Sequence, residues 1–140
     1  MMGTTIRAAL SPSNKYWIDK HRYYELKHFC LQYPQWRKFY KAIEGLIFPN
    51  VVMGETPRSK SVSDFTAKQA VAKAYYADKI EMVEKAAEQA DKDLASYILK
   101  AVTEGLSYTY LKSKLEIPCG KDMYYDRYRK FFWILSELRG

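Results

Sequence analysis

Hydrophobic residues recur along the chain at the spacing of amphipathic helices, and no stretch shows the sustained alternation of a half-exposed strand. Two stripes with successive spacings of four, three, four and three residues are the clearest. One stripe is Trp17, His21, Tyr24, His28 and Leu31, and the other is Tyr76, Ile80, Val83, Ala87 and Ala90. The pattern predicts an all-α protein, with the two stripes forming either its core or the seams of a homodimer.

The N-terminal part predicts a helical hairpin within residues 13–47. Ser13 or Asn14 can cap a first helix, which the hydrophobic spacing carries to about Leu31. Pro34 then suits the first turn of a second helix, because its missing N–H is not needed there. We expect these two helices to form a domain of their own.

The segments on either side of the hairpin carry no helical signal. Residues 1–12 are predicted to be a disordered N-terminus. Residues 48–65 contain two Pro, one Gly and three Ser without a sustained hydrophobic period, so we expect a flexible connector there. A third helix, the longest, is predicted to follow over about Thr66–Ala90.

The region 66–140 is predicted to be helical and to end in a helix-turn-helix. Asp91 or Asp93 can cap a fourth helix, and Gly105 can end it in a left-handed conformation. Ser107 then begins a short fifth helix, and the break "PCGK" separates this helix from a sixth, "DMYYDRYRKFFWILSEL". A capped helix, a short helix, a tight break and a longer helix occur in this order in helix-turn-helix motifs.

The distribution of charge favours an anionic partner at the two ends of the chain. The net charge is +7. Residues 1–60 contribute +6, residues 61–105 contribute −2, and residues 106–140 contribute +3. Many solvated surfaces are basic, so this distribution supports nucleic-acid binding only in combination with a suitable motif.

The sixth helix has the composition of a DNA-reading helix, which lies in the major groove in a helix-turn-helix. Its spacing places Tyr124 and Tyr128 on an inner face, continued by Phe131, Leu135 and Leu138. Lys121, Tyr125 and Arg129 point away from that face, so we expect them to read base edges. Arg127 and Lys130 are expected to contact phosphates. The alternative is a basic amphipathic helix that only closes a helical bundle.

The full set of residues expected to contact DNA includes three on the preceding helix. It consists of Ser107, Lys112, Lys114, Lys121, Tyr125, Arg127, Arg129 and Lys130.

The segment "AVTEGLSYTYLKSKLEI" resembles the scaffold half of the DNA-binding module in the fourth region of sigma factors. The residues that carry the resemblance are Glu104, Gly105, Leu106, Ser107, Tyr108, Leu111, Leu115 and Ile117. Two departures are visible. Lys112 stands where a small residue is usual, and "PCG" replaces a Ser cap with an extra residue before Met123. The second departure leaves the register of the reading helix open by about one residue.

The order of elements from "YYELKHFCLQYPQWRKFYKAI" to the C-terminus resembles the RinA/ArpU group of phage transcriptional regulators. A Tyr-Pro turn after the first helix, a polar loop, a long helix beginning near "TAKQAVAKAYY" and a sigma-like C-terminal reader carry this resemblance over roughly residues 21–140. It implies control of late phage genes through promoter DNA, in contact with bacterial RNA polymerase and in the cytoplasm of the host cell.

Other chemistry has little support in the sequence. His21, Glu25 and His28 have a spacing that can hold a metal on one helix face, but the hydrophobic stripe around the histidines favours packed side chains. Phosphate-binding, dinucleotide-binding and nucleophile-elbow motifs are missing, so we expect neither an enzyme nor a cofactor. Cys30 and Cys119 lack CxxC partners and are expected to be reduced thiols. Apolar runs fall short of the roughly 20 residues that a membrane span needs, so no membrane contact is expected.

Two functions of other classes remain open at this point. The chain could bind a host protein or ribonucleoprotein through its basic face, as a nuclease inhibitor would, and would then have no affinity for duplex DNA alone. A DNA-packaging accessory would bind duplex DNA without stimulating transcription.

Overall fold

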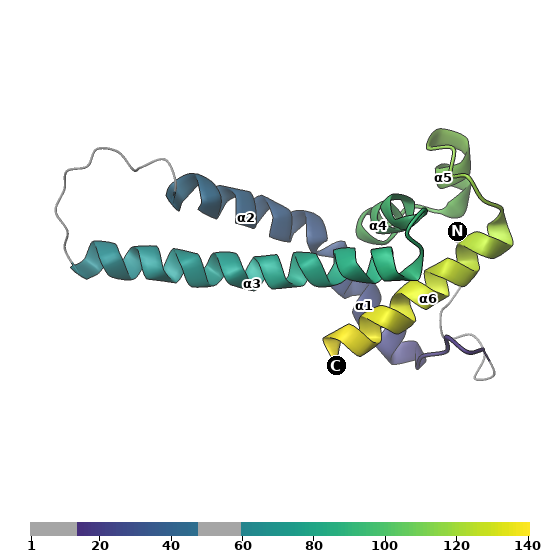
Figure 1. Ribbon diagram of the computed structural model, residues 1–140, viewed down its shortest axis with the longest axis horizontal. Coiled ribbons are helices and arrows are strands. Elements are labelled where there is room, and N and C mark those ends of the chain that lie inside the picture. Colours follow the sequence, from purple (N-terminus) through teal and green to yellow (C-terminus); the bar gives the residue numbers. More distant parts are fainter. Residues whose placement is uncertain (1–13, 48–59) are drawn as a thin grey trace. The chain divides into compact units, whose positions relative to one another are not determined.

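The structure is a computed structural model that describes residues 14–47 and 60–140 (Figure 1). These residues form α-helices and contain no strand, which confirms the predicted all-α class. The helices are α1 (Lys20–Leu31), α2 (Tyr33–Ile47), α3 (Lys60–Ala90), α4 (Ala95–Glu104), α5 (Tyr108–Lys114) and α6 (Lys121–Arg139). The predicted disordered N-terminus, 1–12, and most of the predicted connector lie outside the described residues.

Two of the predicted helix starts are wrong, and neither aspartate proposed as the cap of the fourth helix is its N-cap, which is Leu94 without a side-chain hydrogen bond. The first helix begins at Lys20, where the Asp19 carboxylate accepts a hydrogen bond from the His21 N–H at 2.9 Å. Asn14 instead accepts from the N–H of Tyr16 at 2.8 Å, so its side chain closes a local turn and does not begin a helix. Helix α3 begins at Lys60 and therefore includes the last six residues of the predicted connector. These six residues contain neither Pro nor Gly, so nothing stops the helix from extending through them.

The chain divides into two compact units at places other than the predicted domain boundaries. Unit 1 combines the described residues up to Tyr33 with Met82–Gly140, and unit 2 is Pro34–Glu81. Helices α1 and α2, predicted as one hairpin domain, thus belong to different units. The reason is that α1 packs on α4 and α6, which are distant from it in sequence.

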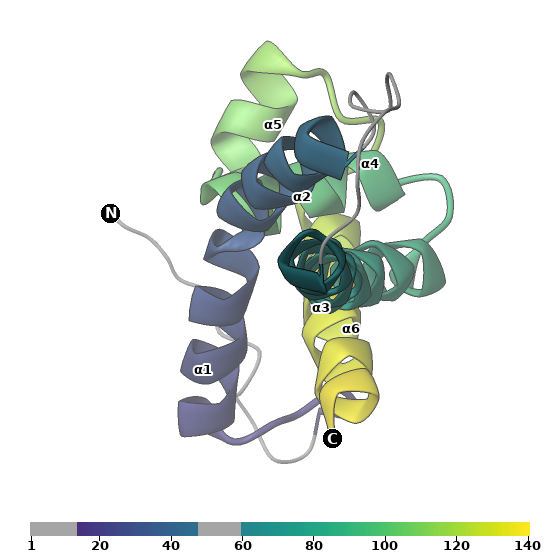
Figure 2. The same cartoon turned by 90° about the vertical axis from the view of Figure 1, so that its left-hand side faces the viewer.

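Unit 1 has one hydrophobic core shared by its helices. Helix α1 contacts α4 and α6, and α4 also contacts α5 and α6. Figure 2 shows α1 and α6 side by side, with α4 and α5 toward the end at which α6 begins. The largest fully buried side chains of this core are Leu26, Val83, Ile98, Leu111, Ile117, Tyr124, Phe131, Phe132 and Leu135.

The predicted stripe on the first helix is not its buried face. Trp17, Tyr24 and Leu31 are each 39% exposed, and His21 and His28 are exposed as well. Tyr23, Leu26, Phe29 and Cys30 are buried in their place. Both faces of α1 carry aromatic side chains, so spacing alone does not decide between them. Packing against α6 determines which face is buried, because the Phe132 ring of α6 lies 5.1 Å from that of Tyr23.

The predicted stripe on α3 is confirmed for its C-terminal part. Val83, Ala87 and Ala90 are buried in unit 1, whereas Tyr76 and Ile80, which belong to unit 2, are half-buried. The Tyr33 hydroxyl donates a hydrogen bond to Glu84 on the same part of α3. This contact ties the junction of α1 and α2 to the portion of α3 that unit 1 contains.

Unit 2 is a pair of helices, α2 and the first part of α3. The rings of Phe39 and Tyr76 lie 5.3 Å apart between centroids, and Lys73 forms an ion pair with Glu44 at 3.5 Å. The ammonium group of Lys79 lies 5.7 Å from the ring of Trp36. Aromatic and cation–π contacts therefore hold these two helices together.

Candidate nucleic-acid interface

The chain reversal between α4 and α5 is fixed by the two predicted capping residues. Gly105 has φ +71°, the left-handed conformation that glycine adopts without strain, and it ends α4. The Leu106 N–H donates to the Ala101 carbonyl at 3.0 Å, which satisfies one of the last free carbonyls of that helix. Ser107 Oγ accepts from the Tyr110 N–H at 3.1 Å and caps α5. Both caps are confirmed, and Ser107 has a structural role.

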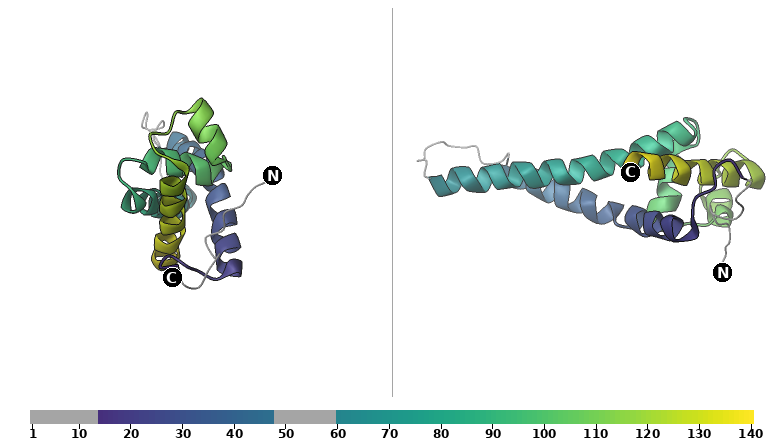
Figure 3. Two further views of the ribbon diagram at one scale, coloured as in Figure 1. Left: turned by 90° about the vertical axis from the view of Figure 1, so that its right-hand side faces the viewer. Right: turned by 90° about the horizontal axis from the view of Figure 1, so that it is seen from below.

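The break between α5 and α6 is held by α5 itself. The N–H of buried Ile117 donates to the Leu111 carbonyl at 3.0 Å. Glu116, at the chain reversal, adopts the left-handed conformation with φ +54°. The Tyr108 hydroxyl donates to the Cys119 carbonyl at 2.9 Å. These contacts fix the break, and α6 therefore begins in a defined direction relative to α5 (Figure 3).

The predicted inner face of α6 is confirmed. Tyr124, Phe131 and Leu135 are each no more than 1% exposed, and the Tyr128 hydroxyl lies 2.7 Å from that of Tyr23 on α1. Burial, the largest effect, raises the pKa of the hydroxyls of Tyr124 and Tyr128 well above the usual value. Both tyrosines are therefore neutral at physiological pH and act as packing residues.

Arg127 has carboxylate partners within the protein. Its Nε donates to Asp91 Oδ2 at 2.9 Å, and Nη1 donates to Asp126. Asp91 also accepts from the N–H groups of Asp93 and Leu94, so one carboxylate joins the turn before α4 to the middle of α6. Two carboxylates neutralise this guanidinium, which argues against the phosphate contact predicted for Arg127.

The pKa of the Asp91 carboxyl reflects this set of contacts. Burial pushes the pKa up, but the hydrogen bond from Arg127 and those from the backbone N–H groups of Leu94 and Asp93 outweigh it, and the pKa lies below the usual value. The hydrogen bond that Arg127 donates to Asp91, set against a smaller opposing effect of burial, in turn raises the pKa of Arg127. The pair is thus ionised across the physiological range.

Arg129 stands apart from the other arginines that the structure describes in unit 1. Arg22 and Arg139 both bind Glu25, and Arg127 binds Asp91, whereas Arg129 has no ion pair within the described residues. Its Nε is buried without a hydrogen-bond partner. The buried Nε is closed to an external group, so only the terminal nitrogens of this half-exposed side chain can donate to an acceptor supplied from outside.

The lysines of the segment are also available to an external anion. Within the described residues Lys114, Lys121 and Lys130 form no ion pair, and Lys112 makes a single long contact, 3.4 Å from Nζ to the Ile117 carbonyl. Lys112, Lys114 and Lys121 are exposed and Lys130 is half-exposed. The neighbouring acids are Asp122, in the favourable first turn of α6, Glu116 at the break, and Asp126, which binds Arg127.

Tyr125 only partly follows the prediction that it points away from the core. Its side chain is half-exposed, with its ring centroid 6.2 Å from that of Tyr108 on α5 and 5.1 Å from that of Tyr124. Burial, with a smaller effect of Tyr108, raises the pKa of its hydroxyl. Tyr125 therefore sits at the edge of a tyrosine cluster, next to Lys121 and Arg129 along the helix.

Two features of unit 1 were missed from the sequence. The Asp91–Arg127 ion pair joins residues 36 positions apart, so local spacing gives no sign of it; the candidacy of Asp91 as a cap was the nearest available signal. The Tyr108–Cys119 hydrogen bond across the break was likewise not predicted.

The other candidate chemistry has the following outcome. Glu25 binds Arg22 and Arg139, and the described residues contain no cluster of His, Cys, Asp and Glu that could hold a metal. Cys30, in α1, and Cys119, in the break, are free thiols as predicted. In the part of the chain that the structure describes, every helix is too short or too polar to cross a membrane.

Comparison of the chain with protein-family models, with curated proteins and with solved structures gives no match.

Proposed function

We propose that the protein is a sequence-specific regulator of transcription that binds duplex DNA through α5, the break and α6, and that it controls late phage genes together with bacterial RNA polymerase. One observation carries the proposal. Within the described residues Arg129 on α6 has no carboxylate partner, while every other arginine of unit 1 described there is bound to a carboxylate.

The acceptor that suits such an arginine is a guanine edge or a phosphate. Guanine presents O6 and N7 in the major groove, and a guanidinium can donate to both at once. Lys121 lies two turns before Arg129 on the same side of α6, with Tyr125 between them. The proposed base readers are therefore Lys121 and Arg129, with Tyr125 contributing its hydroxyl or its ring.

The remaining unpaired cations suit the DNA backbone. Lys112 and Lys114 lie on α5 and Lys130 on α6, on either side of the fixed break. Phosphate contacts from such side chains supply affinity and register but no sequence information. Arg127 has a different part in the proposal, because its ion pair with Asp91 holds α6 in place.

The experiment has two steps. DNA fragments retained by the full chain from the genome of the phage or its host are sequenced, and a promoter fragment obtained in this way is used for transcription in vitro with bacterial RNA polymerase. Stimulated or repressed transcription from that fragment supports the proposal. Binding without any effect on transcription indicates the DNA-packaging function, and a complete lack of retained duplex indicates a protein or ribonucleoprotein partner.

A further inference from the structure

Unit 2 buries too few side chains to form a hydrophobic core of its own. Among the residues of this unit whose side chains are described, Trp36 and Ile43 alone are buried hydrophobic residues. Five large apolar side chains of the same unit are exposed: Phe39 (40%), Leu46 (56%), Phe65 (52%), Val71 (70%) and Tyr75 (57%). Helices that pair in bundles normally bury a continuous apolar stripe, which a single pair of helices cannot do.

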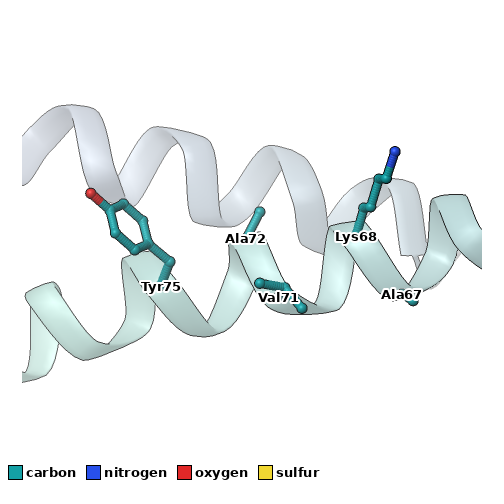
Figure 4. Close-up of a pocket in the computed structure, with 5 residues that line it drawn as sticks. All are labelled: Ala67, Lys68, Val71, Ala72 and Tyr75. Atoms are coloured by element: carbon teal, nitrogen blue, oxygen red, sulfur yellow. The ribbon is translucent and has the colours of Figure 1, made fainter.

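The two most exposed of these side chains, Val71 and Tyr75, lie along one side of α3. Ala67, Lys68, Val71, Ala72 and Tyr75 line a shallow, almost entirely apolar groove (Figure 4). Asp64, one turn before Lys68, is exposed and has no ion pair within the described residues. This stripe runs beside the side of α3 that faces α2, where Lys73 and Tyr76 make their contacts.

The charges along the stripe complement those of a second copy only if the two α3 helices run antiparallel. If two α3 helices lie antiparallel with a two-fold axis between Val71 and Ala72, Lys68 faces Tyr75 of the second copy and Asp64 faces its Lys79. The first contact places an ammonium group on an aromatic ring, and the second is an ion pair. Lys79 already lies 4.6 Å from the ring of its own Tyr75, so it borders the groove.

We propose that unit 2 is a dimerisation element, in which α3 of a second copy of this chain docks antiparallel on the stripe Asp64, Lys68, Val71, Ala72 and Tyr75. Two α2–α3 pairs then form a four-helix bundle, whose α3–α3 seam covers Val71 and Tyr75 of both copies. A parallel pair would place Lys68 against Lys68 and Asp64 against Asp64, and like charges destabilise such a contact. The inference is independent of the proposed function, because it concerns a surface on the other unit.

The oligomeric state of the full chain tests the docking surface. Analytical ultracentrifugation over a concentration series is expected to give a dimer for the natural sequence. Val71→Glu should raise the dimer dissociation constant at least about tenfold, since it puts two carboxylates at the centre of the seam. Ala70→Glu adds the same charge to an exposed position of α3 outside the stripe and should leave the constant unchanged. Circular dichroism checks that both variants keep their helix content.

A monomer at every concentration overturns the proposal, as does a dimer that Val71→Glu and Ala70→Glu affect equally. The direction of the helices is tested separately by disulfide cross-linking in a Cys119→Ser background. Val71→Cys lies beside the two-fold axis and should cross-link. Asp64→Cys should not, because the antiparallel arrangement separates the two copies of this residue by about 22 Å along the helix. Efficient cross-linking through Asp64→Cys contradicts the antiparallel arrangement.

Discussion

Arg127 and Arg129 are two positions apart on α6 and have opposite surroundings. Arg127 is bound by Asp91 and Asp126, whereas the guanidinium of Arg129 has no carboxylate partner among the described residues. The number of positive charges in a helix therefore overstates what is available to an anion. The partners of each guanidinium determine whether it serves the fold or an external ligand.

Arg129→Ala is expected to relax the sequence preference of DNA binding as well as its strength. A bidentate arginine–guanine contact is worth roughly 1–3 kcal/mol of discrimination, which corresponds to about a fivefold to 150-fold loss in the ratio of specific to scrambled affinity. Lys130→Ala is the matched control, because a lost phosphate contact should weaken both duplexes alike. A fluorescence-anisotropy competition with the two duplexes measures the ratio. An unchanged ratio for Arg129→Ala would show that another side chain reads the bases.

Arg127→Ala is expected to act on the fold. It leaves the mostly buried Asp91 carboxylate without its charged partner, and loss of a partner from such a group costs about 1–3 kcal/mol. Urea denaturation of the natural sequence and the variant measures the difference in the free energy of unfolding. Lys114 is exposed and forms no ion pair in the part of the chain that the structure describes, so Lys114→Ala should change that free energy by less than about 0.5 kcal/mol.

Acid should weaken the fold through Asp91. Its pKa is lower in the folded protein than the value of about 3.9 in an unfolded chain, so folding releases a proton from this group at low pH. The stabilisation is complete above about pH 5 and is lost as the pH falls through the lower folded-state pKa. Unfolding free energies measured between pH 3 and pH 6 should fall less steeply with acid for Asp91→Asn. Equal slopes for the two proteins would rule out this contribution.

The short elements around α5 depend on single capping residues. Ser107→Ala removes the acceptor for the Tyr110 N–H and should lower the free energy of unfolding by about 0.5–2 kcal/mol. Gly105→Ala should cost roughly 1–2 kcal/mol, because φ +71° strains any residue with a Cβ. The nearest atom to that Cβ is Leu31 Cδ2 at 3.9 Å, an ordinary contact, so the cost is one of backbone conformation. Thermal melts followed by circular dichroism measure both changes, and melting temperatures equal to that of the natural sequence would contradict these roles.

The elements that the sequence predicted well are those that local rules determine. The end of α4 at Gly105, the cap at Ser107 and the inner face of α6 depend on residues within two turns of one another. The buried face predicted for α1 was wrong because α6, about 100 residues away in sequence, packs against Tyr23 and leaves Tyr24 exposed. The phosphate contact predicted for Arg127 took no account of Asp91, because this partner lies 36 positions earlier.

The division of the molecule into two units separates two kinds of surface. Unit 1 carries the cations of α5 and α6 that form no ion pair with any described residue, and unit 2 carries the exposed apolar stripe of α3. A dimer formed through unit 2 would carry two copies of α6, one from each chain. The two-fold symmetry of many bacterial operators matches the two-fold symmetry of such a dimer. The stretch of α3 proposed to dimerise continues into the part of the helix that belongs to unit 1.

Duplex binding by the full chain as a function of salt tests the central claim most directly. A duplex recovered from the pull-down and a scrambled duplex are titrated between low and moderate salt. We predict tighter binding of the recovered duplex, and a log–log slope of about −0.9 for each phosphate contact, or about −2.7 per copy if Lys112, Lys114 and Lys130 each hold one. Affinity for neither duplex at low salt, or binding that is flat with salt and equal for both, would contradict the account and make α6 only the last helix of a bundle.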